Sequence, residues 1–217
     1  MKVLLFGATG MVGQGVLREC LRDESVQHVL SVGRSVTGQN HHKLNELKHD
    51  DFMNLGTIEN ALTGFDACFF CLGVSSVGMS EEHYRKISYD FTLSLAQTLV
   101  KLNPSMTFIY VSGTGTDSTE TGKIMWARVK GKTENDLLKL PFKAAYMFRP
   151  GVILPLHGVK SKTKLYRVMY QFLSPIYPLL RKLKNVTTTE QVGQAMISVT
   201  KSGYHSPYLE NSDINSI

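Results

Sequence analysis

The amino-acid sequence predicts an α/β fold, a doubly wound parallel sheet with helices on both faces and a small helical lid near the carboxyl end. Short apolar runs that favour strands alternate with longer segments of helical period, which is typical of this class. The chain has 217 residues, 42% hydrophobic and 19% charged, as in an ordinary globular domain. We therefore expect one domain over residues 1–217, with residues 155–186 as the lid on the substrate side.

The expected strands are short and rich in β-branched or aromatic residues. In chain order they are Lys2–Phe6, His28–Gly33, Glu46–Asp50, Asp66–Leu72, Thr107–Val111 and Lys143–Phe148. Helices are expected near residues 11–22, 55–62, 80–102 and 123–140. A further helix through Val192 and Val199 is expected to be capped by Thr188 or Thr189.

The clearest helix is the one over residues 80–102. Ser80 is a natural N-cap, and Glu81 and Glu82 lie in the first turn, where carboxylates are favourable. Asn103-Pro104 ends the helix. Its apolar stripe has helical spacing and consists of Tyr84, Ile87, Phe91, Leu95, Leu99 and Leu102.

The positive charge of the chain is concentrated in one segment. Lys and Arg number 24 against 18 Asp and Glu, but seven of these cations lie between residues 157 and 184, which contain no acid. The rest of the chain is close to neutral, which argues against a nucleic-acid binder. Residues 163–173 form an apolar stripe expected to pack as a lid, and contact of residues 160–184 with an anionic membrane is the alternative.

The three cysteines are expected to be unpaired core residues. Cys68 and Cys71 lie in an apolar strand, where positions three apart point to opposite faces, so they fit neither a zinc knuckle nor a redox motif. Free buried cysteines are typical of a reducing compartment, and the amino terminus does not resemble a signal peptide. We therefore expect a cytoplasmic protein. The histidines have no matching ligand set, so no metal site is expected; the cluster considered is His41, His42 and His49.

A glycine-rich turn follows the first strand and leads into the first helix. Gly7 permits the tight turn, Gly10 lets the backbone approach a pyrophosphate, and Gly13 lets the helix pack on the strand. The amino terminus of the helix then offers N–H groups to the phosphates. This pattern predicts a Rossmann-type dinucleotide site that also includes Thr9, Met11 and Val12, although a glycine-rich turn without ligand has the same sequence.

The end of the second strand favours NADP(H) over NAD(H). A cofactor without a 2′-phosphate is usually held there by Asp or Glu, whereas this chain has Arg34 and Ser35. A guanidinium suits a phosphate, and a solvated Arg34 is the alternative. Asp51 is placed to accept from the adenine amino group, or else forms a turn.

The chain resembles the atypical short-chain dehydrogenases/reductases, in particular the subgroup around the Tat-interacting oxidoreductase of animals. The resemblance extends to about residue 155. Its motifs are the turn over residues 7–13, Gly33-Arg34, Phe70-Cys-Leu-Gly73, Ile87-Ser-Tyr-Asp90, Ser112, Val129-Lys-Gly131 and Phe148-Arg-Pro-Gly-Val152. In that family the segments after the fourth and sixth strands line the cofactor cleft, which here implies Leu72, Gly73, Pro150, Gly151, Val152 and Ile153.

The resemblance also implies a catalytic set, from which this chain departs. Family enzymes use Ser or Thr with Tyr-x-x-x-Lys, in which lysine holds the nicotinamide ribose and tyrosine exchanges the substrate proton. Here Lys130 is retained, but Trp126 stands at the tyrosine position, and an indole N–H does not exchange its proton near neutral pH. Ser112 and Thr114 are candidate substrate-oriented hydroxyls, although Ser112 can also cap its loop. A water molecule or Tyr84 is the alternative proton donor, and Tyr84 fits the core stripe better.

The sequence therefore supports two functions. The first is an NADP-dependent reductase or epimerase-like enzyme acting on a small carbonyl or hydroxyl compound. The second is a cofactor-binding sensor or interaction protein without redox turnover, which Trp126 favours. The substrate itself is not encoded in any motif we find.

Overall fold

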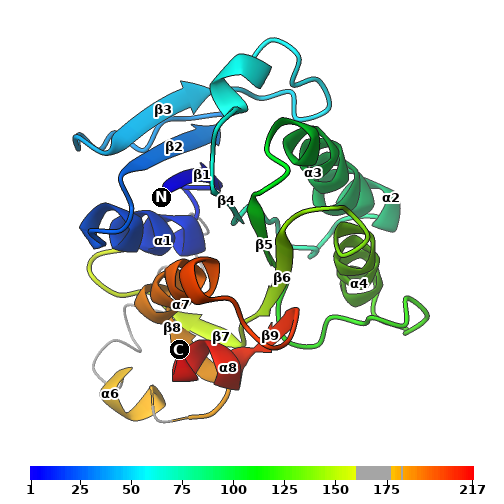
Figure 1. Cartoon of the computed structure of the whole chain (residues 1–217). Coiled ribbons are helices and arrows are strands. Elements are labelled where there is room, and N and C mark those ends of the chain that lie inside the picture. The colour runs from blue at the N-terminus through cyan, green and yellow to red at the C-terminus, as the bar shows by residue number, and fades with distance from the viewer. Residues whose placement is uncertain (160–176, 182) are drawn as a thin grey trace.

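The computed structural model describes residues 1–159, 177–181 and 183–217 (Figure 1). Its centre is a seven-stranded sheet of order β3-β2-β1-β4-β5-β6-β9, in which every neighbouring pair is parallel. The strands are β1 (Lys2–Phe6), β2 (His28–Gly33), β3 (Leu44–Lys48), β4 (Ala67–Phe70), β5 (Thr107–Val111), β6 (Ala144–Arg149) and β9 (Tyr208–Glu210). The predicted doubly wound α/β fold is confirmed.

Helices cover both faces of the sheet (Figure 1). One face packs against α1 (Met11–Arg22) and α7 (Thr189–Ser202), and the other against α3 (Phe91–Leu102) and α4 (Met125–Leu137). Residues of β1 alternate between two hydrophobic clusters, with Val3 in one and Leu4 in the other. A strand buried on both faces has to be apolar throughout, which is why β1 and β4 are continuous hydrophobic runs, whereas the edge strand β3 is partly exposed and polar.

The direction in which strands are added reverses next to β1. The chain places β2 and β3 on one side of β1 and then returns to place β4, β5 and β6 on the other. Ligands of open α/β sheets bind beyond the carboxyl ends of the strands at such a reversal. The loops after β1 and β4 therefore meet where a ligand site is expected.

Several predicted elements differ in their bounds by one to three residues: β4 and α4 are shorter than predicted, and β6 is shifted by one residue. Strand β3 begins at Leu44 rather than Glu46, and the helix expected over 55–62 is only a short 3-10 turn, η1 (Glu59–Leu62). The helix over 80–102 is continuous but contains a π-turn, η2 (Lys86–Asp90), between α2 (Glu81–Arg85) and α3. This wider turn contains one residue more than an α-helical turn. The spacing of hydrophobic residues in the sequence does not reveal it.

Both predicted helix caps are present. The Oγ of Ser80 accepts from the backbone N–H of His83 at 3.3 Å, and the Oγ1 of Thr188 accepts from that of Gln191 at 3.1 Å. These bonds satisfy N–H groups that have no partner inside the helix.

Several short elements lie towards the carboxyl end. Strands β7 (Val152–Leu154) and β8 (Val186–Thr188) form a separate parallel pair, and α8 (Asn211–Ser216) follows β9. Helix α6 (Tyr177–Leu180) belongs to the basic segment, whereas the helix predicted over residues 163–173 lies outside the described residues. No helix in the described ranges is long and apolar enough to cross a membrane.

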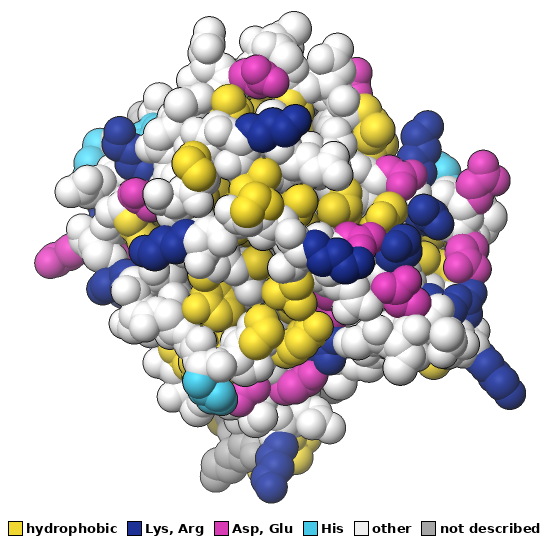
Figure 2. All heavy atoms as spheres, turned by 45° about the vertical axis from the view of Figure 1, so that its right-hand side comes forward, with side chains coloured by type: hydrophobic (Ala, Val, Ile, Leu, Met, Phe, Trp, Pro, Cys, Tyr) yellow, Lys and Arg dark blue, Asp and Glu magenta, His cyan; other side chains and the backbone are white. Residues whose placement is uncertain are grey.

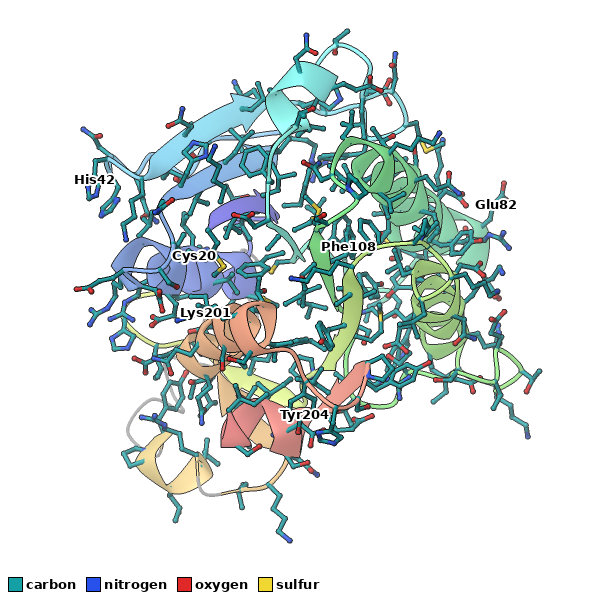
Figure 3. All side chains as sticks on the ribbon, viewed as in Figure 1. Cys20, His42, Glu82, Phe108, Lys201 and Tyr204 are labelled. Atoms are coloured by element: carbon teal, nitrogen blue, oxygen red, sulfur yellow. The ribbon has the colours of Figure 1, made fainter. Side chains whose placement is uncertain are left out.

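The cysteines are free, as expected. Cys20 and Cys68 are buried, and Cys68 and Cys71 pack into different hydrophobic clusters on opposite sides of the sheet. Figure 3 shows Cys20 on α1 and Phe108 on β5, both inside the molecule. Burial raises the pKa of the Cys71 thiol to about 12, which keeps it protonated and unreactive.

The surface charges of the body are mixed. On the face shown in Figure 2, Lys and Arg side chains alternate with Asp and Glu side chains around a group of hydrophobic ones. This distribution agrees with a body whose net charge is near zero outside residues 157–184.

Candidate functional site

The turn after β1 has the geometry of a phosphate-binding loop. Gly7 has φ +88°, and a Cβ there would lie 2.7 Å from the backbone of Cys71. A Cβ on Gly13 would lie 2.1 Å from the carbonyl oxygen of Gly7, so helix α1 packs directly on the turn. The N–H of Gly10 donates to the same carbonyl at 2.8 Å. Only glycine fits at 7 and 13, as the sequence predicts.

The amino terminus of α1 is suited to an anion. Its N-cap is Gly10, which offers no side chain to the first N–H groups, and the first turn contains no acid. The free N–H groups and the positive end of the helix dipole therefore face the cleft. The residues fit a pyrophosphate, which binds such a terminus in dinucleotide-binding folds.

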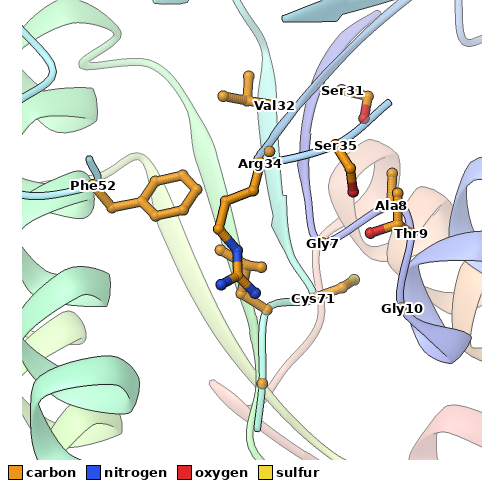
Figure 4. Close-up of a pocket in the computed structure, with 13 residues that line it drawn as sticks. Gly7, Ala8, Thr9, Gly10, Ser31, Val32, Arg34, Ser35, Phe52 and Cys71 are labelled. Atoms are coloured by element: carbon orange, nitrogen blue, oxygen red, sulfur yellow. The ribbon is translucent and has the colours of Figure 1, made fainter. Parts of the chain in front are cut away.

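A first cavity, of about 150 Å³, opens beside this turn (Figure 4). It is lined by Gly7, Ala8, Thr9, Gly10, Ser31, Val32, Gly33, Arg34, Ser35, Phe52, Cys71, Leu72 and Gly73. None of these residues is acidic. Figure 4 shows the Arg34 guanidinium in the middle of the cavity, between Phe52 and the turn. Among the described residues Arg34 makes no hydrogen bond or ion pair, so its donors are available to a ligand.

Asp51 does not line this cavity. Its Oδ1 accepts from the backbone N–H of Met53 at 3.1 Å, which is the turn-forming role, and the next residue, Phe52, takes the place beside Arg34. Sequence reasoning missed Phe52. The available signal was an aromatic residue within a polar loop, and here that residue is buried against Phe6.

A second and larger cavity, of about 730 Å³, continues from the first along the strand ends. It brings together the predicted residues Gly10, Met11, Val12, Leu72, Gly73, Ser112, Thr114, Trp126, Lys130, Pro150, Gly151, Val152 and Ile153. Its lining also includes residues that sequence reasoning missed, namely Cys71, Val74, Ser75, Val111, Gly113 and Asn185. The two cavities share Gly10, Cys71, Leu72 and Gly73, so they form one cleft.

Lys130 lies on α4, and its Nζ donates a hydrogen bond to the backbone carbonyl of Ser112. Helix α4 packs closely on the loop that follows β5 because Gly131 has no side chain. A Cβ on Gly131 would lie 1.8 Å from the carbonyl oxygen of Asp117 in that loop. Burial lowers the pKa of Lys130 to about 8, and the nearby Glu134 carboxylate opposes that shift. The charged form of Lys130 is therefore less stable here than in water. A ligand that offers oxygen acceptors would stabilise this charged form.

The hydroxyls of the loop after β5 are engaged with β6. Ser112 Oγ donates to the carbonyl of Phe148 at 3.1 Å, and Thr114 Oγ1 donates to that of Arg149 at 3.0 Å. Both oxygens retain lone pairs, but their protons are directed into the loop, which fits the capping role of Ser112. Tyr84 is 2% exposed and lines neither cavity, so it belongs to the core.

Trp126 lies one helical turn before Lys130 and lines the same cavity. It is half-buried, and the tip of its indole is 3.6 Å from the position of a Cβ on Gly115. The ring thus occupies the end of the cleft beside the lysine. An indole fills this space and donates one hydrogen bond, but it supplies no exchangeable acid.

The histidines His41, His42 and His49 are not arranged as metal ligands. The rings of His41 and His42 stack with centroids 4.4 Å apart, and His49 Nε2 is 2.7 Å from the carbonyl oxygen of Asp51. Across the described ranges, no three His, Cys, Asp or Glu side chains are arranged to hold a metal ion.

Residues 3–123, more than half of the chain, match the model of the NAD dependent epimerase/dehydratase family. The chain belongs to this family. The glycine turn and the strand-end cleft described above lie largely within the matched region. The resemblance to short-chain dehydrogenases/reductases is thereby confirmed.

Two curated relatives are similar to the chain over about 70% of its length. Protein HTATIP2 of Rattus norvegicus is 28% identical over 154 residues, which cover 70% of this chain and 62% of the rat protein. The mitochondrial protein FMP52-2 of Scheffersomyces stipitis is 27% identical over 155 residues, covering 69% of this chain and 65% of that relative. The chain thus matches less than two thirds of the length of either relative.

Among solved structures, the enzyme WbmF of Bordetella bronchiseptica in complex with NAD+ has the same fold. The TM-score is 0.70 at 13% sequence identity, and the match covers 99% of this chain and 76% of WbmF. At this identity the likeness shows the Rossmann-type fold alone.

Proposed function

We propose that the cleft binds NADP(H) in preference to NAD(H). The observation that carries the proposal is the Arg34 guanidinium, which has no partner among the described residues and lies in a cavity lined by no described carboxylate. A ribose 2′-hydroxyl is usually held by an acid at this position, whereas a 2′-phosphate is matched by a guanidinium fork. Ser35 adds a hydroxyl on the same rim.

In this proposal the remaining site residues divide along the cleft. Arg34 and Ser35 would hold the 2′-phosphate, and Phe52 would pack beside the adenine. The turn over residues 7–13 would hold the pyrophosphate. The larger cavity would receive the nicotinamide end, and Lys130 would hold its ribose. These assignments are supported by the lining of the two cavities and by the uncapped amino terminus of α1.

We further propose an oxidoreductase or epimerase-like activity on a small carbonyl or hydroxyl compound. A bound nicotinamide would supply hydride transfer. In this chain Lys130 would orient the ribose, and Trp126 and Ser112 would form the walls of the space in which the substrate reacts. Trp126 favours the second function, a cofactor-binding sensor or interaction protein without redox turnover, because the usual proton donor is absent.

Calorimetric titration with NADPH and NADH tests the cofactor proposal. NADPH should bind about 10- to 100-fold more tightly, because a charge-assisted hydrogen bond contributes about 1.5–3 kcal/mol. Arg34→Ala should remove most of this preference and leave NADH affinity nearly unchanged. Arg22→Ala, at the far end of α1, removes the same charge away from the cleft and should alter neither affinity. Equal affinities for the two cofactors in the unmodified protein would refute the preference.

We propose a cytoplasmic location on the basis of the free cysteines, although the relative from Scheffersomyces stipitis is named mitochondrial. Microscopy of the full chain carrying a carboxyl-terminal fluorescent tag separates the two compartments. Co-localisation with a mitochondrial marker would overturn the cytoplasmic assignment.

A further inference from the structure

One wall of the larger cavity is formed by a peptide unit that is hydrogen-bonded on both of its edges. The carbonyl of Pro150 accepts from the backbone N–H of Thr114 at 2.9 Å. The N–H of Gly151, in the same peptide unit, donates to Oδ1 of Asn211 at 2.8 Å. These two bonds together fix the plane of the Pro150–Gly151 peptide.

This peptide needs such anchoring because position 151 requires glycine. A Cβ on Gly151 would lie 2.3 Å from the carbonyl oxygen of Asn185. Glycine has the widest backbone freedom of all residues, so the unit on its amino side can rotate unless both edges are held. Thr114, which lines the cavity, holds one edge of the peptide. Asn211, which does not line the cavity, holds the other edge.

Asn211 also holds the neighbouring segment of the wall. Its Nδ2 donates to the carbonyl of Lys184 at 2.7 Å, and the following residue, Asn185, accepts from the N–H of Val152 at 2.9 Å. Asn185 and Val152 both line the cavity. One side chain therefore joins two segments that lie 60 and 27 residues away along the chain.

The direction of the Asn211 side chain is itself fixed. Asn211 is 5% exposed and is the first residue of α8, which lies beside β7, β8 and β9 (Figure 1). The helix begins with a capping box, in which the N–H of Glu210 donates to Oδ2 of Asp213 at 2.8 Å. Both polar atoms of the amide are used on main-chain atoms of the wall segments.

We propose that Asn211 is a positioning residue for the nicotinamide end of the bound cofactor. It acts through Gly151 and Lys184 by holding the wall in the shape that receives the ring, and it does not itself line the cavity. The inference rests on the proposed function, since it assumes that the dinucleotide lies in the cleft. It concerns only the half of the cleft that is remote from Arg34.

The test compares NADPH with adenosine 2′,5′-bisphosphate, which carries the 2′-phosphate but lacks the nicotinamide half. Asn211→Ala should weaken NADPH binding about 5- to 10-fold, as expected for one buried hydrogen bond, and should change bisphosphate binding by less than about twofold. Asn211→Asp retains an oxygen acceptor for Gly151 but loses the donor to the carbonyl of Lys184, so it should weaken NADPH binding less than Asn211→Ala does and leave bisphosphate binding unchanged.

Asn215→Ala is the matched control. Asn215 is on the same helix, and its Nδ2 donates to the carbonyl of Val186 at 2.8 Å, but it makes no bond to the Pro150–Gly151 unit. Its loss should leave both affinities unchanged. Equal weakening by Asn215→Ala and Asn211→Ala would reduce Asn211 to general packing and overturn the proposal, as would equal weakening of both ligands by Asn211→Ala.

Two further outcomes are decisive. If the unmodified protein binds neither ligand, the proposed function fails; if it binds both and a folded Asn211→Ala protein binds NADPH normally, only the present inference fails. If Asn211→Ala does not fold, amide hydrogen exchange in the unmodified protein replaces it. A held peptide predicts slow exchange of the Gly151 N–H, and exchange as fast as in an open loop would overturn the proposal.

Discussion

Arg149 donates two parallel hydrogen bonds to the carboxylate of Glu134, from Nε to Oε1 at 3.1 Å and from Nη2 to Oε2 at 2.5 Å. Glu134 is fully buried, so its charge depends on this guanidinium for compensation. Arg149 also donates to Glu210 at 3.2 Å and to Ser118 Oγ at 2.6 Å. The end of β6 is thereby joined to α4, to β9 and to the loop before α4.

Removing the guanidinium should destabilise the fold strongly. Arg149→Met leaves the buried Glu134 carboxylate without the guanidinium that hydrogen-bonds it, which costs about 3–5 kcal/mol in the free energy of unfolding. Replacing both residues by Met should cost less than Arg149→Met alone, because no buried charge then remains. Urea denaturation monitored by circular dichroism measures these differences.

A partly exposed ion pair supplies the control for this prediction. Arg128 lies 2.7 Å from Glu81, whose side chain is 50% exposed, and Arg128→Met should change stability by about 1 kcal/mol or less. If Arg128→Met and Arg149→Met proved equally costly, burial would not be the source of the effect.

The part-buried ammonium of Lys130 should make stability depend on pH. Its pKa is about 8 in the folded protein and near its ordinary value when unfolded, so the folded state carries the cost of the charge in full below pH 8. Between pH 8 and 10.5 the unfolded chain binds more protons, and the stability of the unmodified protein should rise relative to Lys130→Met. The expected gain from pH 7 to pH 10 is about 2 kcal/mol.

Urea titrations of both proteins at several pH values check this slope. Lys123→Met, at an exposed position, is the control and should run parallel to the unmodified protein. A constant difference between Lys130→Met and the unmodified protein would contradict the lowered pKa.

Trp126 should limit turnover. General acid–base catalysis contributes about 10²–10⁴-fold, so the unmodified protein should oxidise NADPH very slowly against aldehydes, ketones and quinones. Trp126→Tyr places a phenol one turn before Lys130 and should raise the rate. Steady-state absorbance of NADPH over a carbonyl panel measures it, with Trp126→Phe as the control that removes the indole without adding an acid. Robust activity that survives Trp126→Phe would show another proton source and end the sensor hypothesis.

The fluorescence of Trp126 should report the cofactor. It is the only tryptophan of the chain and lines the cavity proposed for the nicotinamide. Titration with NADPH should change its emission, whereas adenosine 2′,5′-bisphosphate should change it little. The same emission change with both ligands would show that the nicotinamide does not bind beside Trp126.

The basic segment should not hold the protein on membranes if its predicted apolar stripe packs as a lid. Among its described residues, Leu179 and Leu183 are exposed and together form only a small apolar surface. Arg181 and Lys184 lie beside them in the sequence. We expect no co-sedimentation with vesicles of anionic lipid at physiological salt. Salt-sensitive co-sedimentation would instead support the membrane interpretation.

The parts of the site that the sequence predicts are those in which a local rule acts. Gly7 and Gly13 are required by the turn itself, and Trp126 and Lys130 share a helix face because they are one turn apart. Arg34 follows a strand whose end has to face the ligand edge. These placements need no knowledge of tertiary contacts.

The parts that the sequence does not predict depend on contacts between distant segments. Strands β7, β8 and β9 have three residues each, too few for a period to appear. Phe52 enters the first cavity because it packs on Phe6, and Asn211 reaches Gly151 across 60 residues. The side chain of Asp51 closes its own turn, which competes with any ligand for the same oxygen.

The distance along the chain between Gly151 and Asn211 also has a consequence for refolding. Pairings between remote segments close large loops and form slowly. Both ends of the cleft depend on such pairings, because Gly7 packs against Cys71 at one end and Asn211 bonds Gly151 at the other. A dinucleotide that contacts both ends binds only the fully folded chain and therefore stabilises it against unfolding by mass action.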